Sequence, residues 1–310
     1  MSLTRERREG MGVLKRSLIM VILISFLTSM VHFGSQMENG QSGMVDAVQA
    51  KTKSKDYQYK SSTLKIKRGK KTIYGKIFLP KSKKKEKFPT VIYSHGFGGG
   101  YEYGVDYAKA LAKKGYAVYC FDFCGGSPDS RSSGSTLDMS IFTEQKDLEA
   151  VIKSLKKKKY VDKKNIFLFG TSQGGAVSAI TAAKHQKEIR GLILFYPAFV
   201  LVDNAKSLFN SVDEIPNKYY LMWMEVGKTY FEDLLDYDIY EDIKTYKKKV
   251  LIVHGDADDI VPLSYSHKAV KTYSSATLKV IKGAGHGFDG ADDEKAIRYI
   301  LSYLEKQKKS

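Results

Sequence analysis

The sequence predicts an α/β fold, with a mostly parallel central sheet and helices on both faces. Short apolar runs of strand type, such as residues 90–93, 117–122 and 191–195, alternate with longer runs of helical pattern. Strands that alternate with helices in this way build parallel sheets. Ligands in such sheets bind beyond the carboxyl ends of the strands, so functional residues are expected in the loops at that edge.

The predicted elements form one domain, residues 51–310. Alternating residues predict a hairpin (63–67 and 73–79) with one solvent-exposed face. Further strands are predicted at 90–93, 117–122, 165–169, 191–195, 250–253 and 276–281, and helices at 105–114, 136–158, 176–185, 264–273 and 292–306. Gly115 follows the first of these helices, as a C-cap glycine does. Residues 198–249 interrupt the alternation and are rich in aromatic residues, which predicts a small helical cap.

The first fifty residues have the pattern of a targeting segment. Several Arg and Lys residues precede an apolar run at 18–31, about 14 residues long, which is short for a membrane-spanning helix and suits a signal peptide. Cleavage is predicted after Ala50. A long polar stretch separates the apolar run from this point, so an uncleaved anchor formed by residues 18–33 is the alternative. Both interpretations predict a secreted or cell-envelope protein with its folded domain outside the cytoplasm.

The chain is strongly basic, with a formal net charge of +17 at pH 7. The excess lies in lysine runs at residues 81–87 and 156–159, which lack the interleaved aromatic residues or the reader motif of a nucleic-acid-binding protein. No nucleic-acid partner is therefore expected. A solvated basic surface, suited to an anionic membrane or cell envelope, is the interpretation.

A G-x-S-x-G motif, centred on Ser172, stands between an apolar strand run and a helical run. Gly170 and Gly174 lack a Cβ atom, so the strand and the helix can approach closely. Ser172 is then expected to adopt a strained backbone conformation that exposes its hydroxyl above the sheet edge. The alternative is a glycine-rich turn that contains an incidental serine.

A serine hydroxyl becomes an effective nucleophile when a base removes its proton and an acid orients that base. His286 lies in a glycine-rich loop after a predicted strand, and the ordinary histidine pKa of about 6.5 suits a general base. Three aspartates compete for the orienting role. Asp258, in H-G-x-x-D-x-x-V-P, is favoured over Asp256 and Asp259, which would instead cap the turn. The order Ser, Asp, His supports this assignment.

The negative charge that develops on a substrate oxygen requires two N–H donors. The backbone of Gln173, directly after the predicted nucleophile, is one candidate, and the backbone of Phe97 in the loop His95-Gly96-Phe97 is the other. His95 and His254 are expected to hold loop backbone at the ends of strands. This chemistry needs no metal ion and no cofactor.

Residues from about 62 to 305 resemble the α/β-hydrolase superfamily, and within it the bacterial feruloyl and cinnamoyl esterases. The loop Cys124-Gly125-Gly126-Ser127 departs from the basic-residue/Gly/His pattern that is commoner there. The stretches that carry the resemblance are His95-Gly96-Phe97, Phe121-Asp122-Phe123 with the Gly/Ser loop after it, Gly170-Thr171-Ser172-Gln173-Gly174-Gly175, His254-Gly255 with Asp258, and Gly285-His286-Gly287-Phe288.

The resemblance implies a serine hydrolase that cleaves small-molecule carboxylic esters through an acyl-enzyme, with Ser172, His286 and Asp258 as its triad. The aromatic cap predicts a slot for short or hydroxycinnamoyl-type acyl groups. A peptidase similar to prolyl-oligopeptidase relatives is disfavoured because no propeller precedes the hydrolase. A lipase acting on monoacylglycerols or lysophospholipids is a further alternative. An alternative of a different class is a non-catalytic basic protein that binds the envelope.

Overall fold

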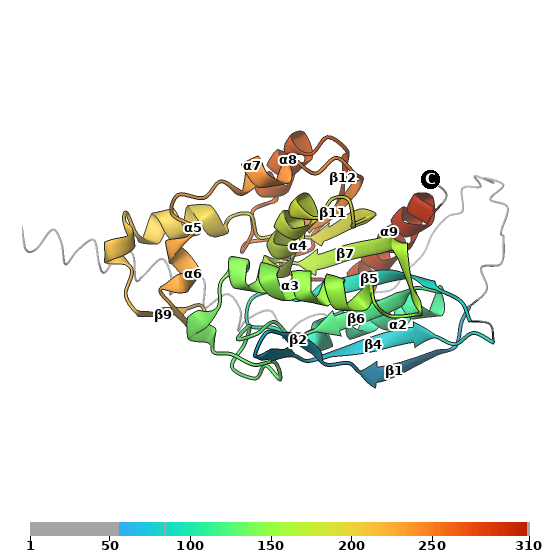
Figure 1. The fold of residues 1–310 in the computed structure, drawn as a ribbon. Coiled ribbons are helices and arrows are strands. Elements are labelled where there is room, and N and C mark those ends of the chain that lie inside the picture. Colours follow the sequence, from blue (N-terminus) through green and yellow to red (C-terminus); the bar gives the residue numbers. More distant parts are fainter. Residues whose placement is uncertain (1–55, 84, 309–310) are drawn as a thin grey trace, which may run out of the picture. The chain divides into compact units, whose positions relative to one another are not determined.

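The computed structural model describes residues 56–83 and 85–308, which belong to one unit of the chain. The predicted leader and its cleavage site lie outside these residues. A single eight-stranded sheet forms the centre of the unit, with helices on both of its faces (Figure 1). No helix in the described ranges combines the length and hydropathy needed to cross a membrane.

The sheet is mostly parallel, which confirms the predicted fold class. The first three strands in spatial order pair antiparallel, and every later pair is parallel. In spatial order the strands are β1 (Tyr59–Thr63), β4 (Gly75–Pro80), β6 (Ala117–Phe121), β5 (Phe88–Ser94), β7 (Val161–Thr171), β8 (Gly191–Phe195), β11 (Val250–Gly255) and β12 (Ala276–Ile281).

Two apolar layers enclose the sheet. Along β7, Ile166 and Leu168 pack into the layer beneath α3 (Ile141–Leu155), α4 (Gln173–Lys184) and α8 (Leu263–Thr272). Phe167 and Phe169 alternate with them and pack into the layer beneath α2 (Val105–Lys113) and α9 (Gly290–Lys308). A strand that is buried on both faces has a continuously apolar sequence, as β7 does over these four residues. Truncating one of these side chains to Ala would cost about 2–5 kcal/mol.

The predicted N-terminal hairpin is present but shorter than expected. β2 (Ile66–Arg68) pairs with β3 (Lys71–Ile73) around Gly69, whose φ is +58°. The chain then leaves the hairpin, and β4 joins the central sheet. Gly75 marks this departure, because a Cβ atom there would lie 2.6 Å from the carbonyl oxygen of Cys120 on β6.

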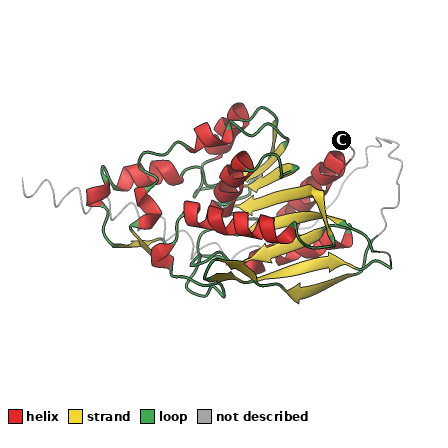
Figure 2. Ribbon diagram, viewed as in Figure 1, coloured by secondary structure: helices red, strands yellow, loops and turns green. Residues whose placement is uncertain are grey.

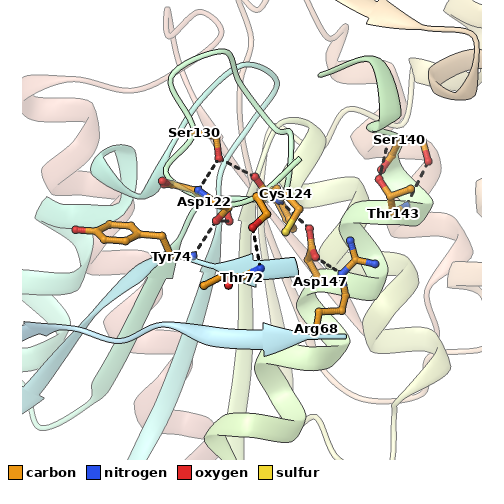
Figure 3. Close-up of polar contacts among 12 residues, drawn as sticks. Arg68, Thr72, Tyr74, Asp122, Cys124, Ser130, Ser140, Thr143 and Asp147 are labelled. Carbon is orange, nitrogen blue, oxygen red and sulfur yellow. Dashed lines mark hydrogen bonds and ion pairs between the residues drawn. The ribbon is translucent and has the colours of Figure 1, made fainter. Parts of the chain in front are cut away.

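The long helix predicted at 136–158 is in fact two elements. A 3-10 turn, η2 (Thr136–Asp138), precedes α3, and Ser140 separates them. The Ser140 hydroxyl accepts the Thr143 N–H at 3.2 Å, and the Thr143 hydroxyl accepts the Ser140 N–H at 2.9 Å (Figure 3). This reciprocal cap starts the helix at Ile141. The apolar periodicity of the sequence continues across this helix N-cap, so the pattern did not reveal the break.

Helix α3 is fastened to the rest of the domain by a buried carboxylate. Asp147 pairs with Arg68 of β2, and its other oxygen accepts the backbone N–H of Cys124 at 2.8 Å (Figure 3). Burial raises the pKa of Asp147, although these contacts favour the ionised form. The contact fixes the loop that follows β6 against the helix that also carries Glu144.

The cap at residues 198–249 differs from the prediction, because it contains strands as well as helices (Figure 2). Met222, with φ of +53°, forms the turn of its hairpin together with Trp223. The sequence analysis did not predict this hairpin, because the aromatic residues that pack the cap mask the alternation of less and more exposed residues in its two short strands. The elements are α5 (Leu201–Leu208), the 3-10 turn η3 (Val212–Glu214), β9 (Lys218–Leu221), β10 (Met224–Gly227), α6 (Thr229–Glu232) and α7 (Ile239–Ile243).

Candidate active site

Ser172 occupies the sharp turn between β7 and α4, with φ of +51° and ψ of −121°. A positive φ is uncommon for a residue with a side chain and costs on the order of 1–3 kcal/mol. Backbone bonds hold it: the Ser172 N–H donates to Phe195 at 3.0 Å, and its carbonyl accepts from Ala198 at 3.0 Å. The flanking glycines are required, since a Cβ atom on Gly170 would lie 2.1 Å from the carbonyl oxygen of Gly174.

The structure brings together the three residues that the sequence singled out. His286 Nε2 lies 2.9 Å from Ser172 Oγ, and His286 Nδ1 lies 2.8 Å from Asp258 Oδ2. When the Nδ1–H group donates a hydrogen bond to the carboxylate, Nε2 is free to accept the serine proton. This arrangement can perform nucleophilic catalysis, and the catalytic roles themselves stay predictions.

Asp258 is held in its ionised form. Burial acts to raise its pKa, but hydrogen bonds from His254, His286 and the backbone outweigh burial, and the pKa is lowered well below its ordinary value. Its Oδ1 atom accepts the backbone N–H groups of Ile260 at 3.0 Å and Val261 at 2.8 Å. The carboxylate therefore stays charged while it orients the imidazole of His286.

His254 has a second role that the sequence analysis missed. Its Nε2 atom lies 2.9 Å from the Val261 carbonyl oxygen, as expected for a residue that holds loop backbone, and also 3.1 Å from Asp258 Oδ2. The Ser266 hydroxyl lies 2.6 Å from Nδ1 and can donate to it, so Nε2 carries the proton. The spacing of four residues between His254 and Asp258 was the available signal.

Tyr196 is a further contact of the site that the sequence did not indicate. It follows β8 with a φ of +36°, and its ring packs edge-on against His286 with centroids 4.8 Å apart. Phe288 packs against the same ring at 5.0 Å. These aromatic contacts restrict the orientation of the imidazole, and nothing in the spacing of the sequence distinguishes Tyr196 from a core tyrosine.

The competing aspartates lie elsewhere in the loops. Asp256 accepts the Gly283 N–H at 2.5 Å and so caps a turn, as expected of an aspartate outside the triad. Asp259 is exposed. Within residues 56–83 and 85–308, no three His, Cys, Asp or Glu side chains are grouped to hold a metal ion.

The two predicted oxyanion donors flank Ser172. Gln173 is the first residue of α4. On the other side, a Cβ atom on Gly96 would lie 3.1 Å from Ser172 Cβ, so the loop that carries Phe97 lies against the serine. His95 fixes this loop: its Nδ1 atom lies 2.8 Å from the Gly96 carbonyl oxygen, and Nε2 accepts the Phe123 N–H at 3.1 Å. The backbone role expected of His95 is confirmed.

Comparisons with known proteins agree with this architecture. A family model described as serine aminopeptidase, S33, matches residues 85–237. Mouse monoacylglycerol lipase ABHD6 is 23% identical over 260 residues, which cover 70% of this chain and 75% of that protein. The structure of Est1E from Butyrivibrio proteoclasticus with bound ferulic acid is 26% identical, with a TM-score of 0.71, and the match covers 78% of this chain and 99% of Est1E.

A shorter match is to the proline iminopeptidase of Thermoplasma volcanium, which is 32% identical over 35% of this chain and 35% of that protein. The fold and these relatives together define the class of protein, an α/β-hydrolase. It is a serine hydrolase that resembles esterases such as Est1E.

Substitutions should separate Asp258 from Asp256 and test the nucleophile. Ser172→Ala removes the attacking oxygen and little volume, so we expect kcat to fall by about 10³–10⁶-fold with the melting temperature retained. Asp258→Asn should cost on the order of 10³–10⁴-fold, because it disturbs the imidazole tautomer. Asp256→Asn is the matched control and should stay within roughly tenfold of the wild type. An inactive Asp256→Asn beside an active Asp258→Asn would contradict the assignment.

The pH dependence should follow histidine and not aspartate. Because the pKa of Asp258 is lowered, its charge is retained until strongly acidic pH. The stability that this charge contributes is complete above the ordinary aspartate pKa of about 4 and is lost below it, as the pH falls towards the lowered value. Activity should nevertheless fall on the acid side of the profile, since a protonated imidazole accepts nothing from Ser172. Initial rates between pH 4 and pH 9 measure this. A rate that stays constant down to pH 4 would exclude histidine as the base.

Proposed function

We propose that this serine hydrolase cleaves small-molecule carboxylic esters that carry short or hydroxycinnamoyl-type acyl groups. The observation that carries the proposal is the chain of hydrogen bonds from Ser172 through His286 to Asp258. An imidazole that is oriented by a carboxylate and bonded to a strained serine is the arrangement that acyl transfer requires.

In the proposed reaction, Ser172 Oγ attacks the ester carbonyl while His286 Nε2 takes its proton. The backbone N–H groups of Phe97 and Gln173 receive the developing oxyanion. The tetrahedral intermediate collapses as the protonated imidazole gives its proton to the departing alcohol, which leaves the acyl group on the serine. Water then attacks the acyl group in the same way, with His286 taking its proton, and the acid is released.

The preference for flat or short acyl groups rests on the cap. Trp223 is 55% exposed at the tip of the β9–β10 hairpin, and its ring packs edge-on against Phe97 at 5.6 Å. A Cβ atom on Gly98 would lie 2.5 Å from Trp223 Nε1, so the indole lies directly on the loop that follows Phe97. An exposed aromatic surface beside this loop suits a planar acyl group. The likeness to Est1E, a structure with ferulic acid bound, supports the same class.

We also propose that the protein acts outside the cytoplasm, at or beyond the cell envelope. The basic and apolar pattern of the leader supports export. A surface cavity of about 790 Å³ beside α3 is lined by Lys146, Lys153, Lys157 and Lys163, among others. This concentration of positive charge suits association with an anionic envelope. The cavity reaches His185, which follows the last residue of α4, at the opposite end of that helix from Ser172.

A panel of esters tests the acyl preference. We expect higher kcat/KM, by roughly tenfold or more, for methyl ferulate or p-nitrophenyl butyrate than for p-nitrophenyl palmitate, because the cap offers a short aromatic surface. Trp223→Ala should lower kcat/KM for methyl ferulate by about 2–10-fold and leave p-nitrophenyl acetate nearly unaffected. A preference for the sixteen-carbon chain would favour the lipase alternative. Cleavage of proline p-nitroanilide in place of esters would favour the peptidase.

N-terminal sequencing of protein from the producing cell tests export. We expect a mature chain that begins at Lys51, or a full-length chain in the membrane fraction if residues 18–33 form an anchor. Fractionation should place both forms outside the cytosol. A soluble cytoplasmic product that retains the first residues would overturn the proposed location.

A further inference from the structure

The side chain of Gln173 is clamped between two elements that are distant in the sequence. Its Nε2 atom donates to Glu144 Oε2 on α3 at 2.9 Å, and its Oε1 atom accepts the Tyr230 hydroxyl on α6 at 2.7 Å. All three residues are almost inaccessible, with exposures of 1% for Glu144, 1% for Gln173 and 3% for Tyr230. Buried polar groups that satisfy one another in this way hold a single geometry.

The acceptors around Nε2 define which way the amide faces. Met139 Sδ lies 3.6 Å from the same nitrogen, and a thioether can only accept. With the nitrogen facing Glu144 and Met139, the amide oxygen faces Tyr230, and the tyrosine hydroxyl is the donor. Burial raises the pKa of Glu144 well above its ordinary value, which favours an uncharged carboxyl as the acceptor.

Tyr230 also contacts the opposite side of the site. Its ring packs edge-on against Phe97, with centroids 5.6 Å apart and planes at 69°. One cap residue therefore bonds to the side chain of Gln173 and packs on the side chain of Phe97. These are the two residues whose backbone N–H groups are the predicted oxyanion donors.

We propose that Tyr230 is a positioning residue that fixes the two oxyanion donors relative to each other, with Glu144 holding Gln173 from behind. The cap then contributes to transition-state stabilisation as well as to substrate contact. This inference rests on the proposed function, because it takes Phe97 and Gln173 as the donors. Its physical basis is that such donors stabilise the oxyanion only within a narrow range of distances, about 2.7–3.1 Å.

Tyr230→Phe tests the inference, because it removes only the hydroxyl and keeps the ring contact with Phe97. We expect kcat to fall by about 10–100-fold with KM changed by less than about threefold, since the loss is confined to the transition state. Tyr246→Phe is the matched control. Tyr246 is equally buried in the same insertion, and its hydroxyl has no hydrogen-bond partner among the described residues, so this variant should match the wild type.

A second pair of variants addresses Glu144. Glu144→Gln keeps an oxygen that can accept from Gln173 and should retain most of the activity, whereas Glu144→Leu removes the acceptor and should lower kcat as Tyr230→Phe does. Melting temperatures recorded for all four variants separate unfolding from mispositioning. If Tyr230→Phe does not fold, the two Glu144 variants still test whether the hold on the Gln173 side chain positions the oxyanion donors.

The rate of labelling by a fluorophosphonate provides a readout that needs no ester substrate, because its phosphonyl oxygen takes the oxyanion position. Slower labelling of Tyr230→Phe and Glu144→Leu, beside unchanged labelling of Tyr246→Phe, is the expected result. Wild-type rates for folded Tyr230→Phe or Glu144→Leu would overturn the inference. A wild-type protein that is labelled but cleaves no ester would refute the proposed function alone, and one that is not labelled at all would refute both.

Discussion

The backbone of Ser172 is the constraint on which the rest of the site depends. A residue held at positive φ raises its hydroxyl out of the turn, but it does so against its own conformational preference. The domain opposes this strain with backbone hydrogen bonds to the end of β8 and to Ala198 in the loop after it, and with glycines where β7 and α4 nearly touch. The eight-stranded sheet thus supplies the rigidity that keeps one serine in an unfavourable conformation.

A single carboxylate organises the other half of the site. Asp258 accepts bonds from two histidines and two backbone N–H groups, and this dense set of donors stabilises a charge that burial alone would disfavour. Only His286 of the two histidines reaches Ser172. His254, tied to Ser266 and Val261, completes the solvation of the carboxylate. The two imidazoles therefore share one partner, and the proposed role as base falls to His286 because it also contacts Ser172.

The alternation of strands and helices was enough to predict the fold class, and the motifs were enough to select Ser172, Asp258 and His286. Both signals are local, since each depends on residues close together in the chain. The parts that escaped prediction are contacts between distant segments. Tyr196 touches His286 and Tyr230 reaches Gln173 only after folding. The helix break at Ser140 and the β9–β10 hairpin were missed because apolar and aromatic periodicity masks short polar signals.

The β9–β10 hairpin pairs only with itself and forms a sheet separate from the central one. Its base is fixed, because a Cβ atom on Gly227 would lie 2.0 Å from the carbonyl oxygen of Leu137. Its tip, at Met222 and Trp223, is exposed except where the Trp223 ring packs on the loop that carries Phe97. Sequence change in the tip therefore leaves the register of every strand in the catalytic domain untouched. In evolutionary terms, this makes the tip a site where the proposed acyl preference can diverge while Ser172, His286 and the residues that support them remain unchanged.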